Sequence, residues 1–255
     1  MNNNYLSVNN LNFEYPDGYK ALRDINFEIE KNERIAVLGP NGAGKTTLIL
    51  HLNGILGELD GKIKIKEFAY NDENISKIRK TVGLVFQDPD DQLFMPTVLE
   101  DAMFGPKNFG FTDKEAENNA LSALKKVKME NFIDKPPHHL SFGQKRKVAI
   151  ASVLASEPEL LVLDEPSSNL DPASRRELIE ILKSLEISLI LVTHDLPMAL
   201  ELCNRSIILN NGEVTTDMKT YEILKSKKIM EENRLELPYG FALHHLEEWN
   251  SEDLI

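Results

Sequence analysis

The sequence predicts an α/β fold with a mixed β-sheet, and three observations support this class. A continuous apolar run at 35–38 is typical of a strand buried on both faces, and 82–86, 160–163, 189–192 and 207–209 are further strand candidates. Apolar and polar residues alternate at 25–29 and 62–66, as in strands with one exposed face. Asn211-Gly212 follows the last candidate and predicts a hairpin.

A helical region interrupts the predicted sheet between residues 86 and 160. Thr112 and Glu115 have the spacing of a capping box, in which each side chain bonds to a backbone N–H of the other residue. An apolar stripe at helical spacing follows, made of Ala120, Leu121, Leu124 and Val127. We therefore expect an inserted α-helical subdomain at about 88–158, entered through a Pro-, Asp- and Gly-rich loop at 88–106.

The chain beyond residue 164 predicts further helices. Asp171 and Pro172 are suited to the N-cap and first position of a helix. Its apolar stripe consists of Leu178, Ile179, Leu182 and Leu185. A weaker helical pattern covers 221–230. We expect a single domain at 1–235, with the helical insertion within it, and a C-terminal tail at 236–255 without a clear period.

The composition excludes several classes of protein. A chain of 255 residues with 42% hydrophobic and 27% charged residues is unlike disordered or low-complexity sequences. Cys203, the single cysteine, cannot form an intrachain disulfide and indicates a reducing compartment. We find neither a signal-peptide pattern nor an apolar stretch of about 18 residues that could span a membrane. The net charge of −12 argues against a nucleic-acid partner, and the basic run at 145–147 is interpreted as a solvent-exposed helix face.

A glycine-rich loop follows the buried strand at 35–38. Residues 39–46 fit the pattern G-x-x-x-x-G-K-[ST] and precede an apolar helical run. Backbone N–H groups and the positive end of the helix dipole would bind a polyphosphate, and Lys45 would reach its β and γ phosphates. The Thr46 hydroxyl is suited to Mg²⁺, which prefers hard oxygen ligands. The predicted phosphate-binding residues are Gly39, Pro40, Asn41, Gly42, Ala43, Gly44, Lys45, Thr46 and Thr47.

Two adjacent carboxylates end the strand at 160–163. A buried strand carries Asp164 and Glu165 to the carboxyl edge of the sheet, where α/β proteins bind ligands. Because side chains alternate along a strand, the two residues should have different tasks. Asp164 is suited to holding Mg²⁺, directly or through water, and Glu165 to polarising a water molecule that attacks the γ-phosphorus.

Residues 140–144 read LSFGQ and resemble the LSGGQ signature of ATP-binding-cassette (ABC) ATPases. Other motifs stand in the order of that family: Tyr15 matches its adenine-stacking aromatic, Gln87 its Q-loop and His194 its switch histidine. Ser168 and Asp171 match its D-loop. This resemblance implies a P-loop NTPase fold of the ABC type, in which the mixed-sheet core carries an inserted α-helical subdomain and an antiparallel β subdomain.

The resemblance also implies which residues act on ATP and Mg²⁺. Lys45, Glu165 and His194 would be catalytic, while Gln87 would join Thr46 and Asp164 at the magnesium ion. In such ATPases each ATP lies between the P-loop of one cassette and the signature of another. The resemblance therefore implies a second ABC ATPase chain, identical or paralogous. The signature residues that would contact the ATP of that partner chain are Ser141, Phe142, Gly143 and Gln144.

Two departures from the family pattern refine the resemblance: Phe142 replaces the first signature glycine, and Lys147 stands where the family usually has arginine. LSFGQ followed by KRKVAIASVLA is similar to the ATPase subunits of energy-coupling-factor importers, especially those for cobalt or nickel. The similarity implies integral membrane transporter subunits as partners and a peripheral position on the cytoplasmic side of the cell membrane. The alternatives are a vitamin-importing ATPase of the same type, another ABC importer ATPase, or a soluble ABC protein without a transport role.

Overall fold

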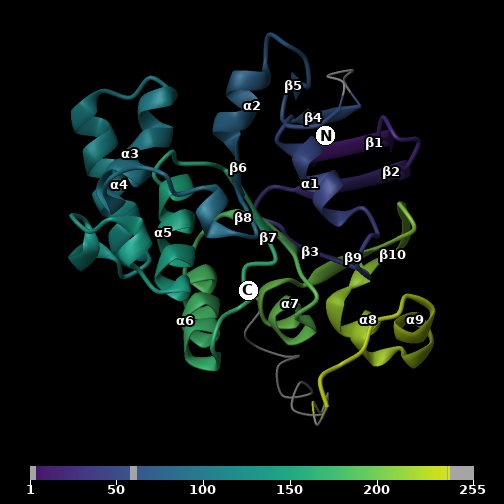
Figure 1. Ribbon diagram of the computed structural model, residues 1–255. Helices are drawn as coiled ribbons and strands as arrows, with labels where there is room; N and C mark the ends of the chain where they lie inside the picture. Colours follow the sequence, from purple (N-terminus) through teal and green to yellow (C-terminus); the bar gives the residue numbers. More distant parts are fainter. Residues whose placement is uncertain (1–3, 58–61, 240, 242–255) are drawn as a thin grey trace.

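Two β-sheets form the centre of the molecule (Figure 1). The structure, a computed structural model, describes residues 4–57, 62–239 and 241. The larger sheet has the order β10-β9-β3-β8-β7-β6 and is parallel except for β10, which pairs antiparallel with β9. Its strands are β3 (Arg34–Leu38), β6 (Val82–Val85), β7 (Leu160–Asp164), β8 (Ser188–Val192), β9 (Arg205–Asn210) and β10 (Glu213–Lys219). The mixed sheet confirms the predicted α/β class, and the hairpin at Asn211-Gly212 joins β9 to β10.

The smaller sheet is antiparallel, with the order β2-β1-β4-β5. Its strands are β1 (Asn4–Glu14), β2 (Lys20–Glu30), β4 (Ile63–Ile65) and β5 (Phe68–Ala69). The alternation predicted at 25–29 is confirmed, because Ile25, Phe27 and Ile29 are buried whereas the residues between them are exposed. One face of this sheet is therefore available to pack against the rest of the domain.

Each face of the larger sheet is covered by its own apolar core, because side chains alternate along a strand. On β3, Ile35 and Val37 pack into a core shared with the smaller sheet and helix α1 (Lys45–Leu52). Their neighbours Ala36 and Leu38 belong to the opposite core, which is built largely from helices. Burial on both faces explains the continuous apolar run, and it leaves the carboxyl ends of the strands free for polar residues.

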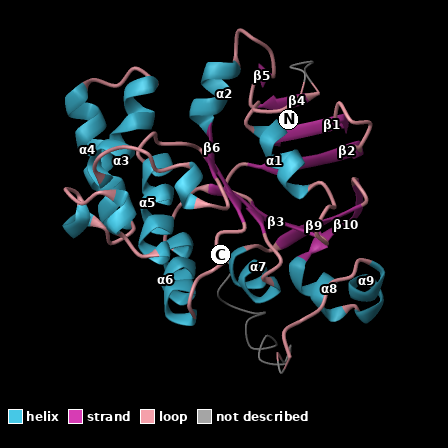
Figure 2. Cartoon of the chain, viewed as in Figure 1, coloured by secondary structure: helices cyan, strands magenta, loops and turns pink. Residues whose placement is uncertain are grey.

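Helices gather on the side of the larger sheet away from the smaller one (Figure 2). Between β6 and β7 the chain forms helices and 3₁₀ turns, and no strand is found in this part. The elements are η1 (Pro89–Asp91), α3 (Val98–Asn108), α4 (Asp113–Lys126), η2 (Glu130–Phe132), η3 (Pro137–His139) and α5 (Phe142–Leu154). The remaining helices are α2 (Ile75–Thr81), α6 (Pro172–Lys183), α7 (Leu196–Leu202), α8 (Thr220–Lys225) and α9 (Lys227–Glu232).

Local capping chemistry fixes where several helices begin. Thr112 and Glu115 form the predicted capping box at α4, and Asp171 accepts hydrogen bonds from the backbone N–H groups of Ala173 and Ser174 at α6. The helix predicted at 221–230 is two short helices instead, because the Ser226 backbone is extended and its side chain caps α9. The predicted tail, 236–255, is described only at 236–239 and 241.

Two expectations about exposure are wrong. Leu121, predicted as part of the buried stripe of α4, is 36% exposed. The basic run at 145–147 is not a solvent-exposed face, because Arg146 is fully buried and its two neighbours are about 15% exposed at their side chains. In the part of the chain that the structure describes, no helix is both long and apolar enough to span a membrane.

Candidate functional site

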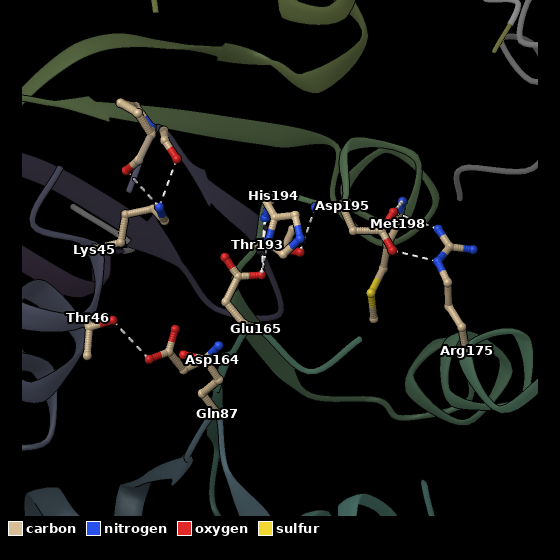
Figure 3. Close-up of polar contacts among 12 residues, drawn as sticks. Lys45, Thr46, Gln87, Asp164, Glu165, Arg175, Thr193, His194, Asp195 and Met198 are labelled. Carbon is tan, nitrogen blue, oxygen red and sulfur yellow. Dashed lines mark hydrogen bonds and ion pairs between the residues drawn. The ribbon is translucent and has the colours of Figure 1, made fainter. Parts of the chain in front are cut away.

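A cavity of about 840 Å³ opens at the carboxyl ends of β3, β7 and β8. Parallel pairing brings these three strand ends to one edge of the sheet, so residues far apart in sequence meet there. The predicted residues Gly39–Thr47, Gln87, Asp164, Glu165 and His194 all line it, and Figure 3 shows several of them. The other lining residues are Tyr19, Leu196, Arg234, Leu235 and Glu236.

The glycine-rich loop is held in a conformation that only glycine permits at two points. Gly39 and Gly44 have φ angles of 140° and 101°. A Cβ atom would lie 2.0 Å from the Leu209 carbonyl oxygen at Gly39 and 2.5 Å from that of Ala21 at Gly44. No side chain in the described ranges caps the start of α1, so its first N–H groups are available to an anion.

Lys45 lies against the same loop and is only 8% exposed. Its Nζ donates to the carbonyl oxygens of Gly39 and Pro40 at 2.8 Å and 3.0 Å. Burial lowers the pKa of the ammonium group, and the nearby carboxylates of Glu165 and Asp164 oppose this shift. The cation is thus pre-positioned at the mouth of the loop, close to where phosphates would bind.

Asp164 has an oxygen atom suited to a metal ion. Its Oδ2 accepts a hydrogen bond of 3.1 Å from the Thr46 hydroxyl, whereas its buried Oδ1 has no hydrogen-bond partner among the described residues. Burial raises the pKa of this carboxyl, and the hydrogen bond from Thr46 opposes the rise. Two oxygen donors with one unsatisfied carboxylate oxygen fit Mg²⁺ chemically, and Gln87 lines the same cavity.

Glu165 and His194 form a pair on the other side of the cavity (Figure 3). Glu165 Oε2 lies 2.8 Å from His194 Nδ1 and also accepts the His194 backbone N–H at 3.2 Å. Glu165 has a left-handed backbone, with φ of 45°, which turns its side chain out of the line of β7. The carboxylate side chain is 10% exposed and the imidazole 68% exposed, so the imidazole has access to a bound molecule.

Two aromatic side chains lie beside the glycine-rich loop. Tyr15 does not line the cavity, and its hydroxyl lies 3.1 Å from Thr47 Oγ1. Tyr19 does line it: the ring is 53% exposed, and its hydroxyl donates to the Gly42 carbonyl at 3.0 Å. The two rings stack with centroids 6.4 Å apart. Sequence reasoning missed Tyr19, because no local pattern shows that its ring lies beside a loop 23 residues further along the chain.

The signature residues do not reach this cavity. Ser141 is exposed and forms a capping box with Gln144 at the start of α5, with hydrogen bonds of 3.3 Å and 3.0 Å. Phe142 and Gly143 begin the same helix, and none of these residues lines the cavity. Ser168 and Asp171 also lie outside it, Asp171 as the cap of α6. The structure therefore separates the predicted residues into a phosphate half, lining the cavity, and a signature half, defined as residues 141–144.

The comparison with protein families decides which proteins combine these features. The family model described as "ABC transporter" matches residues 22–168, which include the glycine-rich loop, the signature and the paired carboxylates. The chain belongs to the ABC transporter family. Its fold is that of an ABC cassette, and like the ATP-binding subunits of this family it is an ATPase.

Relatives of this ABC ATPase cover nearly all of the chain. A Streptomyces avermitilis protein named as an ABC transporter ATP-binding protein is 57% identical over 92% of the chain and 90% of its own length. The energy-coupling factor transporter ATP-binding protein of Methanococcus maripaludis is 44% identical over 97% of the chain and 90% of its own length. The resemblance to energy-coupling-factor ATPases is therefore confirmed.

Solved structures agree with the fold. CbiO1 from Clostridium perfringens, described as part of the ABC transporter complex CbiONQ, superposes with a TM-score of 0.79 and 39% identity, over 96% of the chain and 99% of its own. A post-hydrolysis dimer of the ATP-binding cassette MJ0796 with ADP and phosphate has a TM-score of 0.75 and 28% identity, over 84% of the chain and 98% of its own.

Proposed function

We propose that this ABC ATPase binds MgATP in the cavity, hydrolyses it, and drives the uptake of a substrate through separate membrane subunits. The observation that carries the proposal is the convergence of Lys45, the Asp164–Thr46 pair and the Glu165–His194 pair at one edge of the sheet. These groups supply a cation, oxygen ligands and a base, which are the components that phosphoryl transfer from ATP requires.

The N–H groups at the start of α1 and the Lys45 ammonium would bind the β and γ phosphates. Thr46, Asp164 and Gln87 would hold Mg²⁺, which when bound neutralises charge on the phosphates. Glu165, ordered by His194, would accept a proton from the attacking water, and the exposed imidazole of His194 would position that water or the γ-phosphate. Tyr19, which lines the cavity and is tied to the loop through Gly42, would stack on the adenine, and Tyr15, whose ring stacks on that of Tyr19, would extend the aromatic surface.

The position of the signature half supports a partner cassette. Residues 141–144 would contact an ATP molecule, yet they lie outside the cavity of their own chain. A second ABC ATPase chain, identical or paralogous, would bring its own signature to this cavity and receive the signature of this chain in return. The dimeric state of the MJ0796 relative supports this arrangement.

A second cavity, of about 390 Å³, supports docking to a membrane subunit. It lies between β6 and the helices α3 and α5. Phe94 and Phe104 lie on its rim and are 64% and 39% exposed. Their rings meet edge to face, with centroids 4.9 Å apart. Exposed aromatic pairs beside a groove are typical of protein interfaces. We propose that an integral membrane transporter subunit inserts a short helix here, which holds the ATPase at the cytoplasmic side of the cell membrane.

Cobalt or nickel ions are the proposed cargo. The proposal rests on the similarity of residues 140–155 to ATPases of energy-coupling-factor importers for these metals. A soluble ABC protein without a transport role would bind nucleic acid, and the net charge of −12 argues against such binding.

The function is tested by purifying the complex through a tag on this chain and reconstituting it into ATP-loaded vesicles. We expect ATP-dependent uptake of radioactive cobalt or nickel, and no uptake with a Glu165→Gln complex. Uptake of a vitamin instead would correct the cargo and retain the ATPase role. A chain that binds nucleic acid and no membrane protein, and supports no uptake, would contradict the transport function.

A further inference from the structure

Arg146 is the one fully buried member of the basic run at 145–147 on α5. Its Nη1 donates to the Phe86 carbonyl at 2.7 Å, and its Nη2 donates to the Gln87 carbonyl at 2.5 Å. Both acceptors belong to the segment that leaves β6 and enters the nucleotide cavity. A side chain on the helix that begins with the signature half therefore holds the backbone of a residue in the phosphate half.

The surroundings of Arg146 show that burying its guanidinium group costs free energy. In the described part of the chain its guanidinium has no ion-pair partner, and its buried Nε has no hydrogen-bond partner. Burial lowers the pKa of Arg146, with Asp88 and Asp164 acting in the opposite direction. The guanidinium carbon lies 5.4 Å from the centroid of the Phe142 ring, within the signature. Burying a cation with two carbonyl oxygens as its hydrogen-bond acceptors costs free energy, which points to a role for the contact beyond stability.

Other contacts tie the same segment, residues 86–92, to α5. The Phe86 N–H donates to Gln92 Oε1 at 3.3 Å, while Gln92 Nε2 donates to the Ala149 carbonyl at 2.7 Å. Lys145 Nζ lies 2.7 Å from Asp90 Oδ1. Phe86 is thus linked to α5 at its N–H through Gln92 and at its carbonyl through Arg146, so a displacement of α5 would act on this segment.

We propose that Arg146 is a positioning residue that couples Gln87 to the signature half. The inference rests on the proposed function, in which Gln87 acts at the chain's own ATP and Ser141 at the ATP of the partner cassette. When the signature half engages that second ATP, α5 shifts, and Arg146 carries the displacement to Gln87 through two carbonyl groups. Occupancy of one ATP site is thereby communicated to the other within a single chain.

A double-mutant cycle in the purified transporter complex tests the coupling. Arg146→Gln removes the fork that bonds both carbonyls, and Lys147→Gln is the matched control. Lys147 is the next residue and bonds instead to Glu177 on α6, at 3.1 Å. We expect Arg146→Gln to lower kcat for ATP hydrolysis about tenfold, with KM changed less than about threefold, and Lys147→Gln to change kcat less than about twofold.

To separate a positioning role from a purely structural one, kcat and KM of Arg146→Gln are measured again in a Gln87→Ala background. If Arg146 acts through Gln87, Arg146→Gln should lower kcat by less than about twofold once Gln87 is alanine. Arg146→Lys, which restores one donor, should give an intermediate kcat and serves if the glutamine variant does not fold. The inference would be overturned if Arg146→Gln lowered kcat by the same factor in the wild-type and Gln87→Ala backgrounds. It would also be overturned if Arg146→Gln left kcat unchanged. A wild-type complex that binds ATP without hydrolysing it would instead count against the proposed function.

Discussion

The phosphate half and the signature half of this ABC ATPase differ in how they are held. In the phosphate half, Lys45, Thr46 and Glu165 each contact another residue of the same cavity. In the signature half Ser141 is exposed, and its side chain bonds only within its own capping box as far as the structure describes the chain. The side chains of the first half are therefore held in place by one another, whereas Ser141 lies outside the cavity of its own chain. The difference supports the proposal that one chain contributes parts to two half-sites rather than forming one whole site.

The largest expected effect tests the chemistry of the phosphate half. Glu165→Gln keeps the shape of the side chain but removes the base, so we expect hydrolysis to fall about 10³-fold while ATP affinity stays within about threefold. Phosphate release and binding of a fluorescent ATP analogue measure the two quantities. Glu180→Gln on α6 is the control, because that side chain is 58% exposed and pairs with Lys183 of the same helix. Hydrolysis retained in Glu165→Gln would remove Glu165 from the proposed role.

A second prediction tests whether the signature half and the phosphate half act on different ATP molecules. Ser141→Arg places a bulky cation in the signature half, outside the cavity of its own chain. We expect ATP affinity of the isolated chain to change less than about twofold and hydrolysis by the complex to fall about 100-fold. Lys45→Ala, in contrast, should weaken ATP binding by the isolated chain at least about tenfold, because it removes the cation that contacts the phosphates. Equal loss of affinity in both variants would mean that the two halves meet within one chain.

A third prediction concerns how far the phosphate half extends. Base–aromatic stacking contributes about 1–3 kcal/mol, so Tyr19→Ala should weaken ATP binding roughly tenfold. Tyr19→Phe keeps the ring, loses the hydrogen bond to Gly42, and should weaken binding less than about threefold. Titration with inorganic tripolyphosphate is the control, because it has no base and should bind both variants equally. Weaker tripolyphosphate binding in Tyr19→Ala would show that the ring acts on the loop instead of the adenine.

The smallest effect sharpens the comparison with two matched capping boxes. Ser141 caps α5 and Thr112 caps α4 with the same pair of hydrogen bonds. Thr112→Ala and Ser141→Ala should each lower the free energy of unfolding by about 1 kcal/mol, as measured by chemical denaturation. Only Ser141→Ala should also slow hydrolysis. If both variants slow it equally, Ser141 acts through helix stability alone.

Local patterns predicted the elements whose causes are local. The apolar run at 35–38, the capping box at Thr112 and the loop at 39–46 depend on neighbours within a few residues, and the structure shows each of them. Arg146 and Tyr19 were not predictable in this way. The partners of Arg146 lie 59 and 60 residues away, and Gly42, the hydrogen-bond partner of Tyr19, lies 23 residues away. Nothing in the period of α5 distinguishes Arg146 from its two basic neighbours.

The glycine-rich loop has a consequence for the mechanics of the whole domain. Gly44 leaves no room for a side chain beside Ala21 of β2 in the smaller sheet, and Gly39 leaves none beside Leu209 of β9 in the larger one. The hairpin residue Gly212 joins them, since its N–H donates to the Ala43 carbonyl at 3.1 Å and its own carbonyl accepts from Arg23. The loop proposed to bind phosphate is therefore also the joint between the two sheets, and we expect a change in their relative angle to alter nucleotide affinity.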